Sequence, residues 1–246
     1  MSLAGVLVID KPGGMTSHDV VMRVRRILGV KKVGHTGTLD PMATGLLPLC
    51  IGGATKIARF LEGGEKEYRA TIKFGVETDT YDAEGKVVAE SDTSGVSEEM
   101  VVEALAQFKG KIQQIPPMYS AVKIGGTPLY KLARKGITVE REPKEVEISA
   151  IDVEEFTMPL LTMKITCSKG TYIRTLCHDL GSVVGCGAHL VALRRTRSGY
   201  YSIQNAITLD ADKSEMIESI VPPKGVIAKF HDESVSTIMK RVLKVA

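Results

Sequence analysis

A single acidic side chain in a glycine-rich segment is the feature of this sequence most typical of catalysis. Asp40 is the only carboxylate between Gly34 and Leu47, a segment that also holds three glycines and three threonines. It precedes a proline, which disfavours helical backbone geometry at the aspartate, and the glycines permit close approach of a ligand to the backbone. One carboxylate on a tight loop suits a nucleophile or base that acts on a bulky ligand. Asp-Pro is also a common start of a turn, so the spacing alone leaves a purely structural role open.

The composition is typical of a globular protein that binds a polyanion. Of 246 residues, 43% are hydrophobic, enough for one large domain or for one domain with a small appendage. The net charge is only +3, but residues 1–69, 116–140 and 161–201 are net basic, while residues 70–115 and 141–160 are net acidic. Such segregation favours a nucleic acid lying across one face. Chance patterning of a solvated surface is the alternative explanation.

Other classes of protein find little support in the sequence. No apolar run approaches the roughly 18 residues of a membrane span, and the first residues, without a basic flank, predict a strand rather than a signal peptide. The four cysteines lack C-x-x-C spacing, although Cys186 and His189 form a C-x-x-H pair near Cys177 and His178. Without a second matching pair these are weak zinc ligands. We therefore expect no metal and reduced, buried thiols, as in a cytoplasmic protein.

Hydrophobic periodicity and turn residues predict the elements that must position Asp40. We expect strands over residues 6–10, 46–51, 68–74, 86–89, 111–123, 144–168 and 190–196. We expect helices over residues 18–28, 54–61, 98–108, 128–135, 172–184 and 210–220. Ser17 is expected to cap the first helix, and residues 79–85 to turn the strand over 68–74 back into 86–89 as a hairpin. The irregular alternation of helices and strands favours an α+β fold with a mixed, mostly antiparallel central sheet flanked by helices.

The segment from Gly34 to Leu47 resembles the catalytic motif of the TruB family of tRNA pseudouridine synthases. Further blocks resemble the other motifs of that family and occur in the family's order over roughly residues 4–200. These blocks are residues 5–12 with 15–17, 66–70 with 78–82 and Gly85, 116–121 with 129–136, 170–176 with 185–190, and 193–195. Each block alone is a weak signal, but together and in order they are specific.

The resemblance implies the pseudouridine synthase fold and the isomerisation of uridine to pseudouridine in RNA, foremost uridine 55 in the T-loop of tRNA. This reaction involves no redox change, so the resemblance implies neither a cofactor nor a metal. It further implies base flipping, as for other enzymes that act on a base within a nucleic acid. The expected partner is the T-arm stem-loop of tRNA, with no membrane and no obligate protein partner. We expect a cytoplasmic monomer.

Three catalytic residues follow from the resemblance. Asp40 matches the family's nucleophile, and it attacks the sugar, attacks the base or assists glycal formation. Arg174 matches the arginine that pairs with this aspartate, since a guanidinium fork holds a carboxylate bidentately and keeps it ionised. Tyr68 matches the residue that stacks on the flipped uracil and removes the proton from C5. Ordinary strand packing is the alternative role of Tyr68.

Five further residues match positions that contact the substrate or support the loop. His35 is expected to occupy the space that the flipped nucleotide leaves in the RNA. Tyr172 and Leu193 are expected to line the uracil pocket. Lys56 matches a lysine near that pocket, and Lys11 is expected to pack under the catalytic loop.

The end of the chain departs from the pattern of many family members, which append an RNA-binding PUA domain. Only 23 residues follow Pro223, too few for an independent β-rich domain. We therefore expect a catalytic domain over residues 1–222 and a short tail over residues 223–246.

Three alternative functions remain at this point. One is guide-RNA-dependent pseudouridine synthesis, and another is an RNA-folding chaperone that uses the same basic face. The third is an acyl-enzyme with the S-x-x-K pattern of residues 120–123, for which residues 169–171 have the wrong order.

Overall fold

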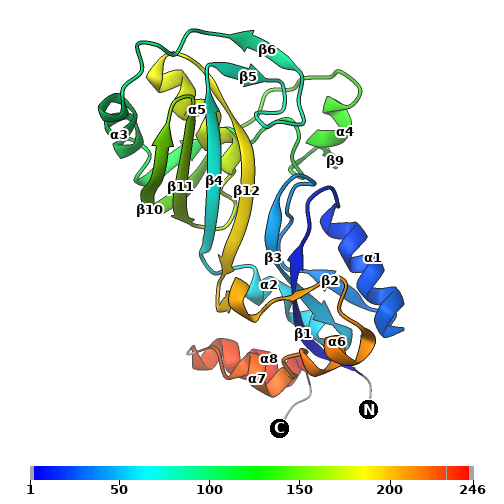
Figure 1. Ribbon diagram of the computed structural model, residues 1–246. Coiled ribbons are helices and arrows are strands. Elements are labelled where there is room, and N and C mark those ends of the chain that lie inside the picture. The colour runs from blue at the N-terminus through cyan, green and yellow to red at the C-terminus, as the bar shows by residue number, and fades with distance from the viewer. Residues whose placement is uncertain (1–2, 231, 244–246) are drawn as a thin grey trace. The chain divides into compact units, whose positions relative to one another are not determined.

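The computed structural model describes residues 3–230 and 232–243, and these residues form two compact units (Figure 1). The first unit runs up to Glu67 and resumes at Arg194, and the second spans Tyr68–Leu193. Strands β4 (Lys66–Phe74) and β12 (Ala188–Ser198) carry the chain from one unit into the other. Each unit is described by itself.

The first unit is built on the antiparallel pair β1 (Gly5–Lys11) and β3 (Thr44–Ile51), which align from Gly5 opposite Ile51 to Lys11 opposite Gly45. The end of β12 joins β3 in parallel, with Arg194 opposite Thr44. A Cβ atom on Gly45 would lie 2.3 Å from the Arg195 carbonyl oxygen, so only glycine permits this approach. Short strands complete the sheet: β2 (Val33–His35), β13 (Tyr201–Ser202) and β14 (Ile207–Thr208).

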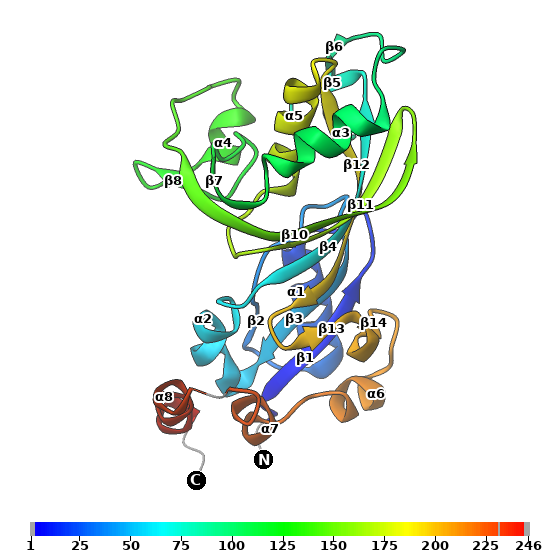
Figure 2. The same cartoon turned by 90° about the vertical axis from the view of Figure 1, so that its left-hand side faces the viewer.

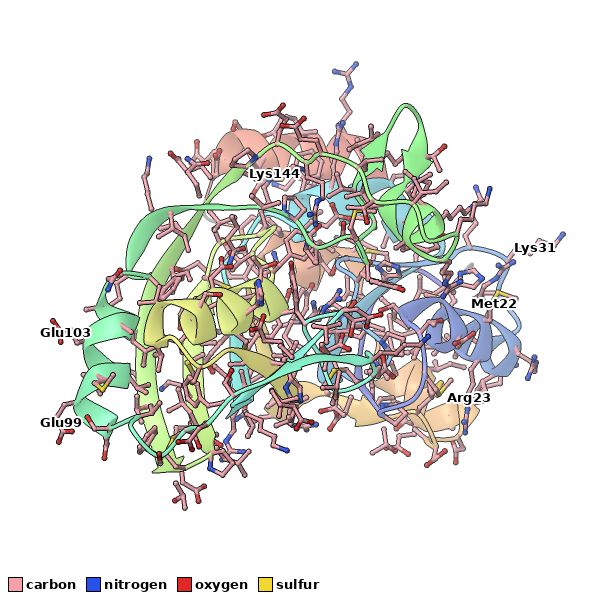
Figure 3. All side chains as sticks on the ribbon, turned by 90° about the horizontal axis from the view of Figure 1, so that it is seen from above. Met22, Arg23, Lys31, Glu99, Glu103 and Lys144 are labelled. Atoms are coloured by element: carbon pink, nitrogen blue, oxygen red, sulfur yellow. The ribbon has the colours of Figure 1, made fainter. Side chains whose placement is uncertain are left out.

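Amphipathic helices cover this sheet. Helix α1 (Ser17–Leu28) buries Val20, Val21 and Val24, while Met22 and Arg23 on the helix, and Lys31 after its end, project outward (Figure 3). The others are the 3-10 helices η1 (Gly52–Ile57) and η2 (Ile203–Asn205), then α2 (Ala58–Leu61), α6 (Lys213–Glu218), α7 (Pro223–Ile227) and α8 (Glu233–Leu243). Helices α7 and α8 pack on the core of this unit. That core contains Val6, Val8, Leu46, Cys50, Ala54, Ile57, Leu61, Tyr201, Val226, Ile227 and Met239.

The second unit contains a sheet in the order β12, β4, β11, β10, β7. Strands β10 (Lys144–Thr157) and β11 (Leu160–Cys167) form a long hairpin, and β7 (Gly110–Gln114) pairs antiparallel with β10. Along β4 the side chains alternate, so Tyr68, Ala70, Ile72 and Phe74 are buried. Two small hairpins lie outside this sheet: β5 (Val76–Thr78) with β6 (Val87–Glu90), and β8 (Lys123–Ile124) with β9 (Thr127–Pro128).

Helices α3 (Glu98–Ala106) and α5 (Ile173–Val184) pack against each other on one face of this sheet, and α4 (Leu129–Ala133) follows the β8–β9 hairpin (Figure 2). Glu99 and Glu103 point away from the packed side of α3 (Figure 3). A Cβ atom on Gly181 would lie 2.2 Å from the Ala188 backbone nitrogen. Glycine at this position therefore lets α5 lie directly against the start of β12.

The predicted α+β class with a mixed sheet is confirmed, and the antiparallel pairs outnumber the parallel ones among the strand pairs described above. The division into residues 1–222 and 223–246 remains a prediction, and residues 231 and 244–246 of that tail lie outside the described residues.

Five local predictions were wrong. The strand expected over residues 144–168 is the hairpin of β10 and β11, because the chain reverses between Thr157 and Leu160. Thr16, not Ser17, caps α1, because its extended backbone lets its hydroxyl accept from the Asp19 N–H in a capping box. The strand expected over 111–123 ends at Gln114, since Pro116 and Pro117 have no N–H for a ladder. Gly75, at φ +82°, ends β4, so the hairpin partner of β6 is β5. Residues 52–57 form a 3-10 helix before a single turn of α-helix.

Candidate active site

The loop that carries Asp40 is fixed by hydrogen bonds on both sides of that residue. The Leu39 N–H donates to Ser17 Oγ over 2.8 Å, and the same hydroxyl donates back to the Leu39 carbonyl oxygen over 3.1 Å. On the other side the Ala43 N–H donates to the Asp40 carbonyl oxygen over 3.1 Å. The half-buried Asp40 carboxylate therefore sits on a backbone whose direction is set before any ligand arrives.

The side chain of Lys11, which is fully buried, supports this loop through hydrogen bonds to backbone carbonyl oxygens. Lys11, at the end of β1, donates from Nζ to the carbonyl oxygens of Pro12, Met15 and Pro41, over 2.9, 2.6 and 3.1 Å. The Gly14 N–H also donates to the Pro41 carbonyl oxygen, over 2.9 Å. A buried charge needs such partners, because an unpaired ion in the interior is very costly. Lys11 thus ties the turn after β1 to the residue that follows Asp40.

A second buried cation holds the other side of the loop. Arg195, 1% exposed on β12, donates to the carbonyl oxygens of Leu46, Gly37 and Thr38, over 2.7, 3.1 and 3.5 Å. The five donors of a guanidinium in a fixed fork suit this bridging of several carbonyls. Together Lys11 and Arg195 fix the backbone before and after Asp40.

The other two predicted residues of the first unit, His35 and Lys56, differ in their burial and in their contacts with the Asp40 loop. His35 lies at the end of β2 in the Asp40 segment, and its Nδ1 accepts from the Gly37 N–H over 3.4 Å. Burial, together with the positive charge of Arg195, lowers the pKa of His35 below its usual 6.5, so the imidazole is neutral at neutral pH. Lys56 is exposed on η1 and, within the described residues, forms no hydrogen bond or ion pair with this loop.

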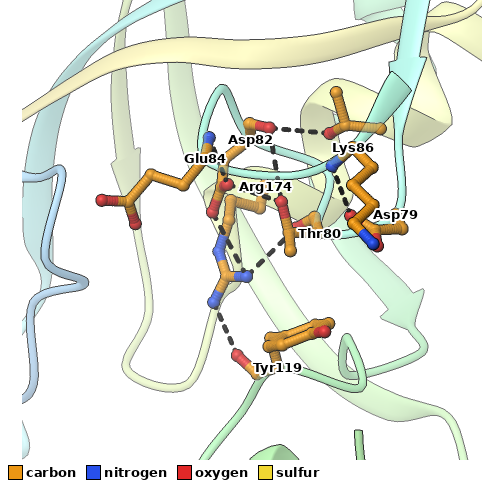
Figure 4. A network of polar contacts seen from close by, with 8 residues as sticks. Asp79, Thr80, Asp82, Glu84, Lys86, Tyr119 and Arg174 are labelled. Carbon is orange, nitrogen blue, oxygen red and sulfur yellow. Dashed lines mark hydrogen bonds and ion pairs between the residues drawn. The ribbon is translucent and has the colours of Figure 1, made fainter. Parts of the chain in front are cut away.

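In the second unit, Arg174 lies at the centre of a buried polar network (Figure 4). Its guanidinium donates to the carbonyl oxygens of Thr80, over 3.1 Å, and Tyr119, over 2.8 Å, and lies 3.5 Å from Asp82 Oδ2. Both charged side chains are 5% exposed. Asp82 Oδ1 in turn accepts from the Thr80 hydroxyl over 2.6 Å and from the Glu84 N–H over 3.1 Å. The Arg174 side chain is therefore oriented by its surroundings.

The remaining predicted residues of this unit lie on β4, on β12 and at the start of α5. Tyr68 is 9% exposed on β4, and Leu193 is 8% exposed on β12, the neighbouring strand. Tyr172 is the residue before α5, and its backbone N–H and carbonyl oxygen bind the side-chain amide of Gln114, over 3.0 and 3.2 Å. This exchange fixes the start of the helix that carries Arg174.

The predicted residues therefore fall into one group in each unit. The first group contains Lys11, His35, Asp40 and Lys56, and the second contains Tyr68, Tyr172, Arg174 and Leu193. The pair predicted between Asp40 and Arg174 would join the two groups and remains a prediction.

Sequence reasoning missed Asp82 and Arg195. Both lie in blocks that resemble family motifs, residues 78–82 and 193–195, so the signal was present. Beyond its place in the block, Asp82 was interpreted as part of a turn, and Arg195 was given no role of its own. A carboxylate or a guanidinium inside such a block is a candidate for a buried partner, because buried charges require one.

The cysteines and the histidine of the C-x-x-H pair pack within the protein and do not form a metal site among the described residues. All four cysteines are reduced and buried, and burial raises the pKa of Cys50 to about 12. The His189 ring bonds the Val76 carbonyl oxygen through Nδ1 over 2.8 Å. Within residues 3–230 and 232–243 no group of three or more His, Cys, Asp and Glu side chains could hold a metal ion. None of the helices described there is long and apolar enough to cross a membrane.

Comparison with known proteins agrees with these motifs. The N-terminal domain of TruB family pseudouridylate synthase matches residues 25–173, and the tRNA pseudouridylate synthase B C-terminal domain matches residues 174–218. The tRNA pseudouridine synthase B of Clostridium tetani is 50% identical over 98% of this chain and 83% of its own length. That of Geotalea uraniireducens is 56% identical over 93% of this chain and 75% of its own.

Solved structures are similar too. The model superposes on a protein in the crystal structure of a Cbf5-Nop10-Gar1 complex with a TM-score of 0.71 and 30% identity, over 92% of this chain and 62% of the other. A second match, in an H/ACA RNP bound to a substrate RNA, has a TM-score of 0.67 and 27% identity, over 92% of this chain and 61% of the other. The predicted pseudouridine synthase fold is confirmed, and the chain belongs to the TruB family of pseudouridylate synthases.

Proposed function

We propose that this chain is a tRNA pseudouridine synthase that converts uridine 55 in the T-loop of tRNA to pseudouridine. Its identity of about 50% over most of its length with tRNA pseudouridine synthase B from several bacteria supports this most strongly. The reaction breaks the bond between N1 of uracil and C1′ of ribose and forms one between C5 and C1′. The proton on C5 is lost and N1 gains one, so the reaction is an isomerisation.

In this proposal Asp40 is the nucleophile, presented by the loop that Lys11 and Arg195 hold. Lys11 then acts on the backbone rather than on the RNA, since its ammonium group donates to three carbonyl oxygens. His35, neutral and half-buried, fills the space that the extruded nucleotide leaves in the T-loop. The exposed Lys56 supplies positive charge near the uracil pocket.

Arg174 supplies the cation for Asp40, and the Asp82 network holds that cation in one orientation. A preorganised charge of this kind stabilises developing charge without reorganisation during the reaction. Tyr68 stacks on the flipped uracil and removes the C5 proton, directly or through a water it positions. Tyr172 and Leu193 line the uracil pocket. The substrate is the T-arm of tRNA, and the enzyme acts in the cytoplasm as a monomer without an obligate partner.

A matched pair of variants tests the proposal. We expect the purified wild-type protein, given an unmodified tRNA transcript and nothing else, to form pseudouridine at position 55, located by mass mapping. Asp40→Asn should form none, while its affinity for the tRNA stays within a few-fold, because binding depends mainly on phosphate contacts. Product from Asp40→Asn would remove Asp40 from the nucleophile role.

Guide-RNA-dependent synthesis is the second candidate, favoured by the similarity to proteins in Cbf5 and H/ACA RNP structures. That similarity is 30% in sequence or less, against about 50% for the tRNA synthases. Modification of a bare tRNA transcript would exclude this candidate. Modification that requires an added guide RNA and protein partners would support it.

A further inference from the structure

Tyr81 has an unusual backbone conformation in the loop that contacts Arg174. Within residues 3–230 and 232–243 it is the one residue other than glycine with a positive φ, +63°. L side chains rarely adopt this left-handed conformation, and it persists only where the surroundings impose it. Tyr81 stands between Thr80 and Asp82, the two residues of this loop that contact Arg174. The Thr80 carbonyl and the Asp82 carboxylate face the guanidinium (Figure 4). Because Tyr81 joins these two residues, its backbone conformation sets their directions.

The Tyr81 side chain is held by a ring from α5. It stacks on His178 with the ring centroids 4.0 Å apart and the planes inclined by 5°. His178 follows Arg174 by four residues, so both project from one face of the helix, one turn apart. Two successive turns of α5 thus contact three successive residues of the loop: Arg174 binds Thr80 and Asp82, and His178 covers Tyr81.

On its Nδ1 side the imidazole faces a carboxylate of a third element. His178 Nδ1 lies 3.6 Å from Glu77 Oε2 of β5, an ion pair when the ring is protonated. Glu77 reaches this place because residue 187 is a glycine: a Cβ atom there would lie 2.5 Å from Glu77 Cγ. The imidazole therefore lies between the ring of Tyr81 and the Glu77 carboxylate, although its buried Nδ1 has no hydrogen-bond partner among the described residues.

We propose that the stacked pair of Tyr81 and His178 is a positioning device for the reaction, which locks the loop over residues 80–82 so that Arg174 keeps one orientation. Neither ring contacts the reacting atoms in this role. The inference rests on the proposed function, because it assigns the stack to catalysis rather than to folding alone. It assigns functions to Tyr81 and His178, residues outside the predicted catalytic set.

Ring-deleting and ring-retaining variants test the device. Tyr81→Asn removes the ring but keeps a residue that tolerates left-handed backbone, and His178→Ala removes the partner. We expect each to lower kcat roughly 3- to 10-fold, the range that corresponds to one aromatic pair, with the tRNA dissociation constant unchanged. The double variant should be no slower than either single one. Tyr81→Phe and His178→Phe should restore most of the rate, and Val183→Ala, exposed on α5, is the control.

A spectroscopic measurement separates this inference from the proposed function. With only five histidines, the His178 ring protons can be assigned by NMR, and stacking on Tyr81 should shift them upfield in the wild type but not in Tyr81→Asn. Wild-type kcat in both ring-deleting variants, or fully additive losses in the double variant, would overturn the positioning role, and unchanged His178 shifts would overturn the stack. If the shift is present but the wild-type protein forms no pseudouridine, the proposed function fails and the catalytic role fails with it, whereas the stack stands.

Discussion

Asp82→Asn is the substitution whose effect the structure defines most closely. The variant keeps the shape of the side chain, and its amide oxygen can still accept from Thr80 and Glu84, but the negative charge 3.5 Å from Arg174 is lost. Since both partners are 5% exposed, solvent cannot replace that charge. Breaking a buried pair costs about 3–5 kcal/mol. The two carbonyl oxygens that remain on the guanidinium place this case at the lower end, about 3 kcal/mol.

A loss of this size is measurable by thermal or urea unfolding. In a chain of this length 1 kcal/mol corresponds to about 2–4 °C in Tm, so Asp82→Asn should unfold roughly 6–12 °C lower than the wild type. Below the transition the variant should bind tRNA normally and turn over at least tenfold more slowly, since its Arg174 is no longer held in one orientation. The control is Asp79→Asn in the same loop, where the carboxylate is exposed and accepts from the Lys86 N–H. That change should stay within about 0.5 kcal/mol. Equal stability and equal turnover of the two variants would refute the reasoning.

Three further predictions concern Lys11, Tyr68 and His35. Lys11→Met removes the buried donor that the carbonyl oxygens of Pro12, Met15 and Pro41 share, although Pro41 keeps its bond from the Gly14 N–H. It should cost about 2–4 kcal/mol of unfolding free energy and slow turnover; a stability equal to wild type in urea would contradict this. Tyr68→Phe should keep RNA binding but lose most turnover in single-turnover assays, while Tyr68→Leu should impair both; a fast Phe variant would leave Tyr68 only as a stacking surface. The lowered pKa of His35 means that the unfolded chain takes up the proton first as the pH falls. The unfolding free energy should therefore decrease below about pH 6.5, less so in His35→Gln, and identical pH profiles would refute it.

Local signals in the sequence predicted the elements whose pattern is regular. The alternation of Tyr68–Phe74 and the three-to-four spacing of valines in α1 each follow from one buried face. The sequence did not predict that Val76–Thr78 would be the partner of β6, because alternation defines a strand but not the strand it pairs with. The left-handed backbone conformation of Tyr81 could not be predicted from the sequence either, because only the surrounding contacts impose it.

The candidate site was predicted as a set of residues rather than as an arrangement. The motif placed Asp40 on a loop, and the structure adds that Lys11 and Arg195 hold its backbone from two sides. The role of Arg195 could not be deduced from charge patterning, because a basic residue near the end of a strand resembles any solvated one. Tertiary structure decides which charges are buried, and it is burial that makes Lys11, Arg195 and Asp82 dependent on particular partners.

Release of tritium from C5 tests the central claim most directly. A tRNA transcript carrying [5-³H]uridine loses its label only where a C–C glycosidic bond forms at C5. We predict that the wild-type protein releases one equivalent per tRNA, that a transcript with cytidine at position 55 releases none, and that Asp40→Asn releases none from either. Release from the cytidine-55 transcript, or from Asp40→Asn, would contradict the account.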